Sequence, residues 1–127
     1  MNIPEGKLYT KTHEWIEFLE EGRARVGLTD HAQHALGDLV YVGLPEIGSQ
    51  LEQNEIVADV ESVKAASEIY APVAGVICLV NEVLLDEPEK INDDPYGAWI
   101  FELDEIAGRE GLLSASEYAE CIQGEEE

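Results

Sequence analysis

Apolar and polar residues alternate near the start of the chain in the pattern typical of half-buried strands. WIEFLE at residues 15–20 alternates in this way, and the apolar-rich run RARVGL at residues 23–28 follows it. Glu21 and Gly22, which separate the two runs, can supply a tight turn. The two runs therefore predict a β-hairpin.

The next segment, LTDHAQHALGD, predicts a short helix after this hairpin. Thr29 or Asp30 can cap its start, and Gly37 can end it because a residue without a Cβ adopts positive φ freely. Further strands are predicted in DLVYVGLP, EIVADVES, SEIYAP, GVICLVN and WIFEL. Many short strands separated by Gly and Pro predict a mostly β fold, either a flattened barrel or a sandwich of antiparallel sheets.

A second helix is predicted near residues 115–123. Ser114 and Glu117 have the spacing of a capping box, in which each side chain bonds the other residue's backbone N–H. We expect this helix to end near Gly124. The acidic segment EVLLDEPEKINDDPYGAW, which precedes the last strand, predicts irregular structure with one helical turn.

The composition fits one soluble domain spanning residues 1–127, with a formal net charge of −21. Such a surface repels phosphate backbones and anionic lipid heads, so nucleic acid and membrane surfaces are poor partners. It favours partners with a basic docking face. The chain has no apolar run of about 20 residues, and its first residues resemble neither a signal peptide nor a transit peptide. We therefore expect a cytoplasmic protein.

The cysteines and histidines do not predict a metal or disulfide site. Cys78 and Cys121 lack C-x-x-C spacing and are expected to be reduced. His31 and His34 can share one face of the short helix, but two histidines alone make an incomplete zinc site.

Lys64 stands alone as a basic residue between Arg25 and Lys90, in the turn expected between two strands. Three interpretations compete. A catalytic amine requires desolvation or a nearby cation, whereas Glu61 and Glu68 favour the charged ammonium. An ordinary solvated lysine is the second interpretation. The third is a modification handle, which a stiff hairpin presents to an acylating enzyme.

A family resemblance favours the third interpretation. YTKTHEW at residues 9–15, VGLTDHAQHALGDLVYVGLPEIG at 26–48, ESVKA at 61–65, APVAG at 71–75, PEKINDDPYG at 88–97 and LLSASEY at 112–118 occur in this order. Together they resemble the H protein of the glycine cleavage system, almost from end to end. Valine before Lys64 separates this family from 2-oxoacid dehydrogenase lipoyl domains, which carry D-K-A, and from biotin carriers, which carry M-K-M. The chain departs from the family in YGAW at 96–99, one residue shorter than usual.

The resemblance implies a lipoyl-carrier fold with lipoic acid in amide linkage at Lys64, in a hairpin near residues 56–70. It implies a non-catalytic carrier that takes an aminomethyl group from glycine decarboxylase, the pyridoxal-phosphate P protein, to aminomethyltransferase, the T protein. Dihydrolipoyl dehydrogenase, the L protein, reoxidises the carrier, and a lipoate-attaching enzyme modifies it. We expect a monomer. Two alternatives remain: a lipoyl donor or relay for another lipoate-dependent pathway, and an acidic interaction module that is never modified.

Four further residues are candidates for roles around the lysine. Glu14 and Glu68 are candidate docking sites for the cationic arm, because exposed carboxylates near the tip can hold an amine. Glu61 and Gly75 are candidates for recognition by the lipoate-attaching enzyme. Gly75 is proposed because glycine permits a turn that β-branched residues resist.

Overall fold

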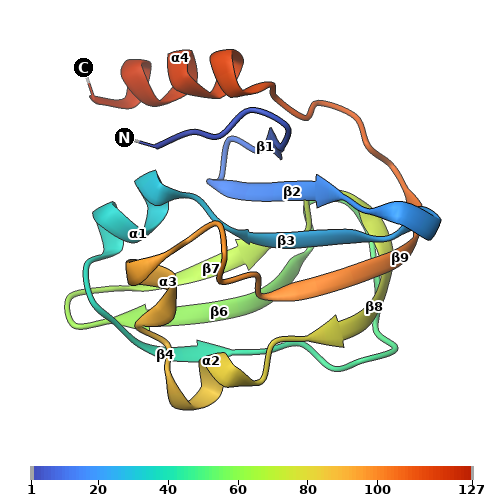
Figure 1. Cartoon of the computed structure of the whole chain (residues 1–127), viewed down its shortest axis with the longest axis horizontal. Helices are drawn as coiled ribbons and strands as arrows, with labels where there is room; N and C mark the ends of the chain where they lie inside the picture. Colours follow the sequence, from blue (N-terminus) through green and yellow to red (C-terminus); the bar gives the residue numbers. More distant parts are fainter. Residues whose placement is uncertain (1, 127) are drawn as a thin grey trace.

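The computed structural model describes residues 2–126 and contains two antiparallel β-sheets with helices around them (Figure 1). The larger sheet contains, in spatial order, β1 (Leu8–Tyr9), β2 (Glu14–Phe18), β3 (Ala24–Leu28), β9 (Phe101–Ala107), β8 (Ala74–Val80) and β5 (Gln50–Leu51). The smaller sheet contains β4 (Leu39–Gly43), β6 (Ile56–Ser62) and β7 (Ala66–Tyr70). The helices are α1 (Asp30–Leu36), α2 (Val83–Asp86), α3 (Lys90–Asp93) and α4 (Ala115–Glu126), with a 3₁₀ turn, η1, at Glu20–Gly22.

The main core lies between the two sheets. Residues on one face of each sheet are buried in a single apolar cluster, which includes Val26, Ile77 and Leu103 from the larger sheet and Val60 and Ile69 from the smaller one. This arrangement follows from the period-two alternation of strands, which turns every second side chain inward. The predicted mostly β fold with two antiparallel sheets is confirmed.

A second buried cluster lies under α4 and consists of Tyr9, Trp15, Tyr118 and Ile122. The predicted capping box starts this helix. The Ser114 N–H donates to Glu117 Oε1 at 2.9 Å, and the Glu117 N–H donates to Ser114 Oγ at 3.2 Å. The predicted end near Gly124 was wrong, because the helix continues to Glu126. A single glycine inside a helix costs only about 1 kcal/mol and does not by itself end it.

The segment between β8 and β9 is more helical than predicted. It contains α2 and α3, which Pro88 separates because proline has no N–H with which to continue a helix. Leu84 and Ile91 are fully buried and anchor one helix each to the main core. The last strand therefore starts at Phe101, two residues later than predicted, and extends to Ala107. Within residues 2–126, no helix is long and apolar enough to cross a bilayer.

Candidate functional site: the lysine at the β6–β7 turn

Lys64 lies at the tip of the β6–β7 hairpin, which projects beyond the two sheets in Figure 1. The β6–β7 ladder closes at the pair formed by Glu61 and Ala66, and the chain reverses over Ser62, the last residue of β6, and residues 63–65. We call these four residues the tip. Lys64 is exposed, and none of the ion pairs between described residues involves it.

Ser62 organises the backbone of the tip. Its N–H donates to the Ala65 carbonyl at 2.7 Å, and its hydroxyl oxygen accepts the N–H groups of Ala65 at 3.0 Å and Lys64 at 3.3 Å. A serine hydroxyl that bonds the backbone two or three residues on is a recognised turn device. This role was not predicted, although a serine at the end of a strand is its usual signal.

The tip also rests on the body of the protein. The Val63 N–H donates to the Asp38 carbonyl at 3.0 Å. The Lys64 side chain passes over Gly37, where an added Cβ would lie 3.4 Å from Lys64 Cε. Gly37 ends α1 with a φ of +81°, as predicted, and its N–H donates to the Gln33 carbonyl. The start of α1 also agrees with the prediction, since Thr29 Oγ1 accepts the N–H of Ala32.

Asn92 on α3 holds the segment on which the tip rests. Its side-chain oxygen accepts the N–H of Leu39 at 2.9 Å, and its side-chain nitrogen donates to the Gly37 carbonyl at 2.8 Å. The same nitrogen lies 3.1 Å from Gln33 Oε1 on α1. This residue was not among the predicted ones, because a contact between positions 53 and 55 apart leaves no local pattern.

The three carboxylates of the β6–β7 hairpin lie on the outer face of the smaller sheet. Cross-strand partners share a face, and Asp59 stands opposite Glu68 while Glu61 stands opposite Ala66. All four of these residues are exposed. The predicted candidates Glu61 and Glu68 are therefore brought together with Asp59 beside the lysine, on a face without a basic residue from β4, β6 or β7.

Glu14, in contrast, is not an exposed carboxylate as expected. Its side chain is fully buried and accepts hydrogen bonds from the hydroxyls of Thr10 and Thr12. Its second oxygen accepts the N–H of Tyr70, at the end of β7 farthest from the tip, at 3.1 Å. Burial raises the pKa of this carboxyl, and the hydrogen bonds from Thr10, Thr12 and Tyr70 act in the opposite direction. Glu14 ties the β1–β2 connection to β7.

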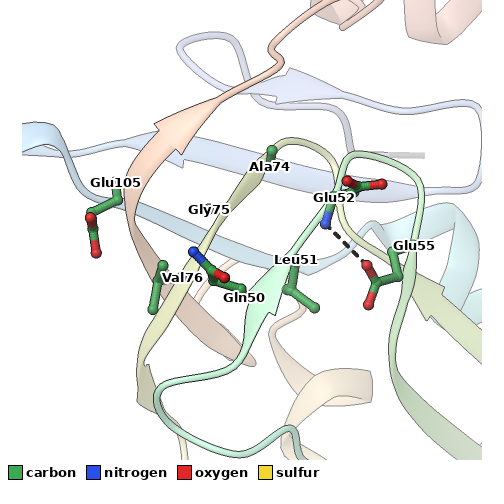
Figure 2. Close-up of a pocket in the computed structure, with 8 residues that line it drawn as sticks. All are labelled: Gln50, Leu51, Glu52, Glu55, Ala74, Gly75, Val76 and Glu105. Carbon is green, nitrogen blue, oxygen red and sulfur yellow. Dashed lines mark hydrogen bonds between the residues drawn. The ribbon is translucent and has the colours of Figure 1, made fainter.

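Gly75 occupies a different position from the one expected (Figure 2). It lies in β8 and pairs with Leu51 of β5, in the larger sheet, so it belongs to neither the tip nor a turn. The reason proposed for a glycine here was wrong. A Cβ at this position would lie 2.8 Å from the Asp104 carbonyl oxygen, so close strand approach, rather than positive φ, requires the glycine.

The histidines belong to the packing of α4 and α1. His13 Nδ1 lies 2.8 Å from the Tyr118 hydroxyl, which also lies 2.7 Å from Thr29 Oγ1. The rings of His13 and His31 are 4.6 Å apart. Among the described residues, no group of three or more His, Cys, Asp or Glu could hold a metal ion.

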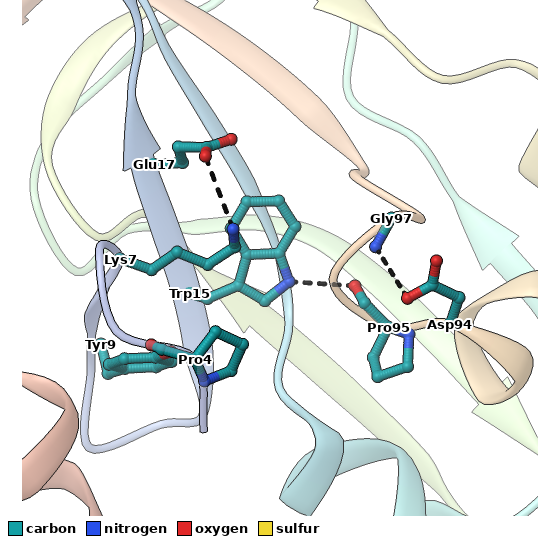
Figure 3. A network of polar contacts seen from close by, with 8 residues as sticks. All are labelled: Pro4, Lys7, Tyr9, Trp15, Glu17, Asp94, Pro95 and Gly97. Carbon is teal, nitrogen blue, oxygen red and sulfur yellow. Dashed lines mark hydrogen bonds and ion pairs between the residues drawn. The ribbon is translucent and has the colours of Figure 1, made fainter. Parts of the chain in front are cut away.

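The loop around residues 96–99, which the sequence predicts to be shortened, lies beside Trp15 (Figure 3). The indole N–H of Trp15 donates to the Pro95 carbonyl at 3.0 Å, and the Gly97 N–H donates to Asp94 Oδ1 at 3.2 Å. On its other side, the Trp15 ring lies 5.2 Å from Lys7 Nζ, which pairs with Glu17. The loop is thus anchored to β2 through Trp15.

Comparisons with known proteins identify relatives of the whole chain. The family model described as glycine cleavage H-protein matches residues 7–125. The chain is 52% identical over 127 residues to a glycine cleavage system H protein from Lachnoclostridium phytofermentans, covering 100% of both chains. It is 51% identical over 124 residues to a probable glycine cleavage system H protein from Pyrococcus abyssi, covering 95% of this chain and 92% of that one.

A solved structure is also similar. The crystal structure of a glycine cleavage system H protein from Mycobacterium marinum superposes with a TM-score of 0.89 at 41% identity. The match covers 95% of this chain and 99% of that one. The sequence motifs, the two-sheet fold and these matches lead to one conclusion: the chain belongs to the glycine cleavage H-protein family.

Proposed function

We propose that this protein is the lipoyl carrier of a glycine cleavage system, with lipoic acid attached to the Nζ of Lys64. The protein receives an aminomethyl group at glycine decarboxylase, delivers it at aminomethyltransferase and is reoxidised by dihydrolipoyl dehydrogenase. In this account the chain is a cytoplasmic monomer of one domain that supplies no catalytic residue of its own.

One observation carries the proposal: the lysine is exposed at the end of a hairpin whose backbone is held from two sides. Ser62 fixes the turn internally, and the bond from Val63 to Asp38 fixes it to the body. An acylating enzyme can therefore approach an amine in a defined place. Nothing in this setting supports a Schiff-base amine, because Lys64 is exposed beside carboxylates rather than desolvated.

The residues present fit an acyl group on the lysine. When bound, lipoate supplies a dithiolane that is reduced as it accepts a one-carbon unit. The Nζ becomes a neutral amide nitrogen on acylation, and no ion pair between described residues has to be broken for this to happen. The Lys64 side chain with its lipoyl group extends about 14 Å, estimated from standard bond lengths.

Glu68 is our candidate carboxylate to hold a cation at the end of the arm. It lies four residues along the strand from Lys64, about 13 Å at the rise of a β-strand, and it is exposed. Its like-charged cross-strand partner Asp59 makes the local field more negative. Tyr70, whose N–H binds Glu14, is two residues farther. A role for Glu14 in docking would additionally require the loop with Thr10 and Thr12 to open.

The charge of the protein supports partners with a basic entrance. With a net charge of −21, the carrier is attracted electrostatically to basic surfaces and repelled by acidic ones. Fast encounter suits a carrier that visits several enzymes in one cycle. Association with each partner should weaken as salt concentration rises, because exposed charges are screened.

Replacing Lys64 with arginine tests the proposal. Lys64→Arg keeps the positive charge but offers no amine that can form the lipoyl amide. Lys90→Arg, at another exposed lysine, is the matched control. With purified partner enzymes, a lipoate-attaching enzyme and glycine, we expect CO₂ release to be lost in Lys64→Arg and retained in Lys90→Arg. Substantial turnover by folded Lys64→Arg would overturn the proposal. Lipoylation without glycine-dependent CO₂ release would instead favour a lipoyl relay for another pathway.

A further inference from the structure

We propose that Asn92 is a positioning residue for the lysine: its side chain orients residues 37–39, the segment on which the hairpin tip rests. Neither the modification nor the carrier chemistry involves Asn92 directly, because it lies on α3 beneath this segment. The expected effect of Asn92 on modification rests on the proposed lipoyl attachment at Lys64.

One peptide plane links Asn92 to the tip. The Asp38 carbonyl and the Leu39 N–H belong to the same planar peptide unit, so the direction of one sets the direction of the other. Asn92 accepts the Leu39 N–H at 2.9 Å, and the Asp38 carbonyl accepts the Val63 N–H at 3.0 Å. Asn92 therefore points this carbonyl at the tip, and hydrogen bonds in series polarise and strengthen one another.

A second contact of the tip with the body also involves Asn92. Gly37, over which the Lys64 side chain passes, has its carbonyl bound by the Asn92 amide at 2.8 Å. The same amide group reaches Gln33 on α1 at 3.1 Å. These two contacts, and the pairing of Leu39 with Ser62 in the β4–β6 ladder, thus join the tip to a segment that Asn92 holds from the opposite side.

An amide side chain is required to make both bonds at the observed geometry. The position needs an acceptor for Leu39 and a donor for Gly37 at once, which asparagine provides and aspartate does not. Packing of α3 against the core depends on its neighbour Ile91, which is fully buried, while Asn92 is half-buried. Loss of Asn92 should therefore loosen the tip more than the fold.

Amide hydrogen exchange of the unmodified full chain tests the inference without any activity. We expect the Val63 amide to exchange about tenfold faster in Asn92→Ala, the effect of losing roughly one hydrogen bond. The Ser62 amide, bonded to Ala65 within the tip, should exchange at an unchanged rate. Asn81→Ala is the matched control, because Asn81 also donates to a backbone carbonyl, that of Trp99 at 2.8 Å.

A second variant keeps the test decisive if Asn92→Ala fails to fold. Asn92→Asp preserves the shape and the acceptor for Leu39 but removes the donor to Gly37, and it should also accelerate exchange at Val63. Unchanged Val63 exchange in both folded Asn92 variants would overturn the inference. An equal acceleration in Asn81→Ala would also overturn it, since the effect would then report general loosening.

The functional readout is the rate at which a lipoate-attaching enzyme modifies each variant. The rates are measured at a temperature well below the melting temperatures of all variants. We expect kcat/KM for modification to fall several-fold in the Asn92 variants and to be unchanged in Asn81→Ala. Equal rates in all variants would refute the positioning role. If the wild-type chain is not modified at all, the proposed function fails, while the exchange experiment still decides whether Asn92 orders the tip.

Discussion

The tip and the cluster under α4 are stabilised in different ways. The tip is held by backbone groups and one serine hydroxyl, and the side chains of Val63 and Lys64 remain exposed. Under α4, the fully buried rings of Tyr9 and Tyr118 stack with their centroids 4.8 Å apart. The Tyr118 hydroxyl also contacts His13 and Thr29.

The difference separates residues required for folding from residues available for chemistry. A buried aromatic side chain contributes to stability through the area it removes from water, so its replacement is costly. An exposed side chain on a backbone-held turn contributes little, so the residue there can be chosen for its reactivity. Lys64 occupies a position where the fold does not demand a lysine.

The largest expected effect comes from breaking the cluster under α4. Tyr118→Ala removes a stacked ring and leaves the hydrogen-bonding groups of His13 and Thr29 without this partner. We expect a loss of about 3–5 kcal/mol in the free energy of unfolding. Val63→Ala at the tip, where the side chain is 71% exposed, should change it by less than about 0.5 kcal/mol. Urea denaturation of both variants measures this contrast, and equal losses would contradict it.

A smaller loss is expected at Gly75. Valine there places a Cβ against the Asp104 carbonyl oxygen and should destabilise the protein by about 1–3 kcal/mol through overpacking. Thermal denaturation measures the loss. The rate of lipoylation of the folded protein then tests the separate prediction that the attaching enzyme depends on Gly75. A normal rate would show that Gly75 serves the fold alone.

The buried Glu14 predicts a pH dependence of the stability of the protein body. Its pKa is raised in the folded state, so the folded state binds the proton more tightly than the unfolded state. The stability that this carboxyl contributes is therefore fully present below its ordinary pKa and is lost as pH rises through the raised pKa. In Glu14→Gln this loss should disappear. Denaturation of both proteins between about pH 4 and pH 8 measures the difference, and parallel pH profiles would contradict the burial argument.

The smallest expected effect on stability belongs to Glu61. Glu61→Gln removes one exposed charge from the outer face of the hairpin, and the free energy of unfolding should stay within about 0.5 kcal/mol. If the attaching enzyme recognises this carboxylate, kcat/KM for lipoylation should fall several-fold, with Glu87→Gln on the surface near α2 as the control. A rate equal to that of the control would remove Glu61 from the recognition surface.

Local patterns in the sequence were sufficient for the features that depend on neighbours. The hairpins, the cap at Thr29, the glycine end at Gly37 and the capping box at Ser114 all follow from residues a few positions apart. These signals are local because the hydrogen bonds that they describe close over one turn.

Features that depend on distant contacts could not be predicted in this way. The burial of Glu14 depends on Tyr70, 56 positions away, and the role of Asn92 depends on Leu39, 53 positions away. Glycine is required at position 75 because the Asp104 carbonyl oxygen of β9 lies too close for a Cβ. Predicting each of these three features requires knowing which strands and helices lie side by side, and composition and periodicity do not specify this.

Peptide mapping after modification tests the central claim most directly. The full chain is incubated with lipoate, ATP and a lipoate-attaching enzyme, and its intact mass and proteolytic fragments are then analysed. The account predicts one lipoyl group per chain, located on Lys64, with Lys7, Lys11 and Lys90 unmodified. An unmodified chain, or a lipoyl group on another lysine, would contradict it.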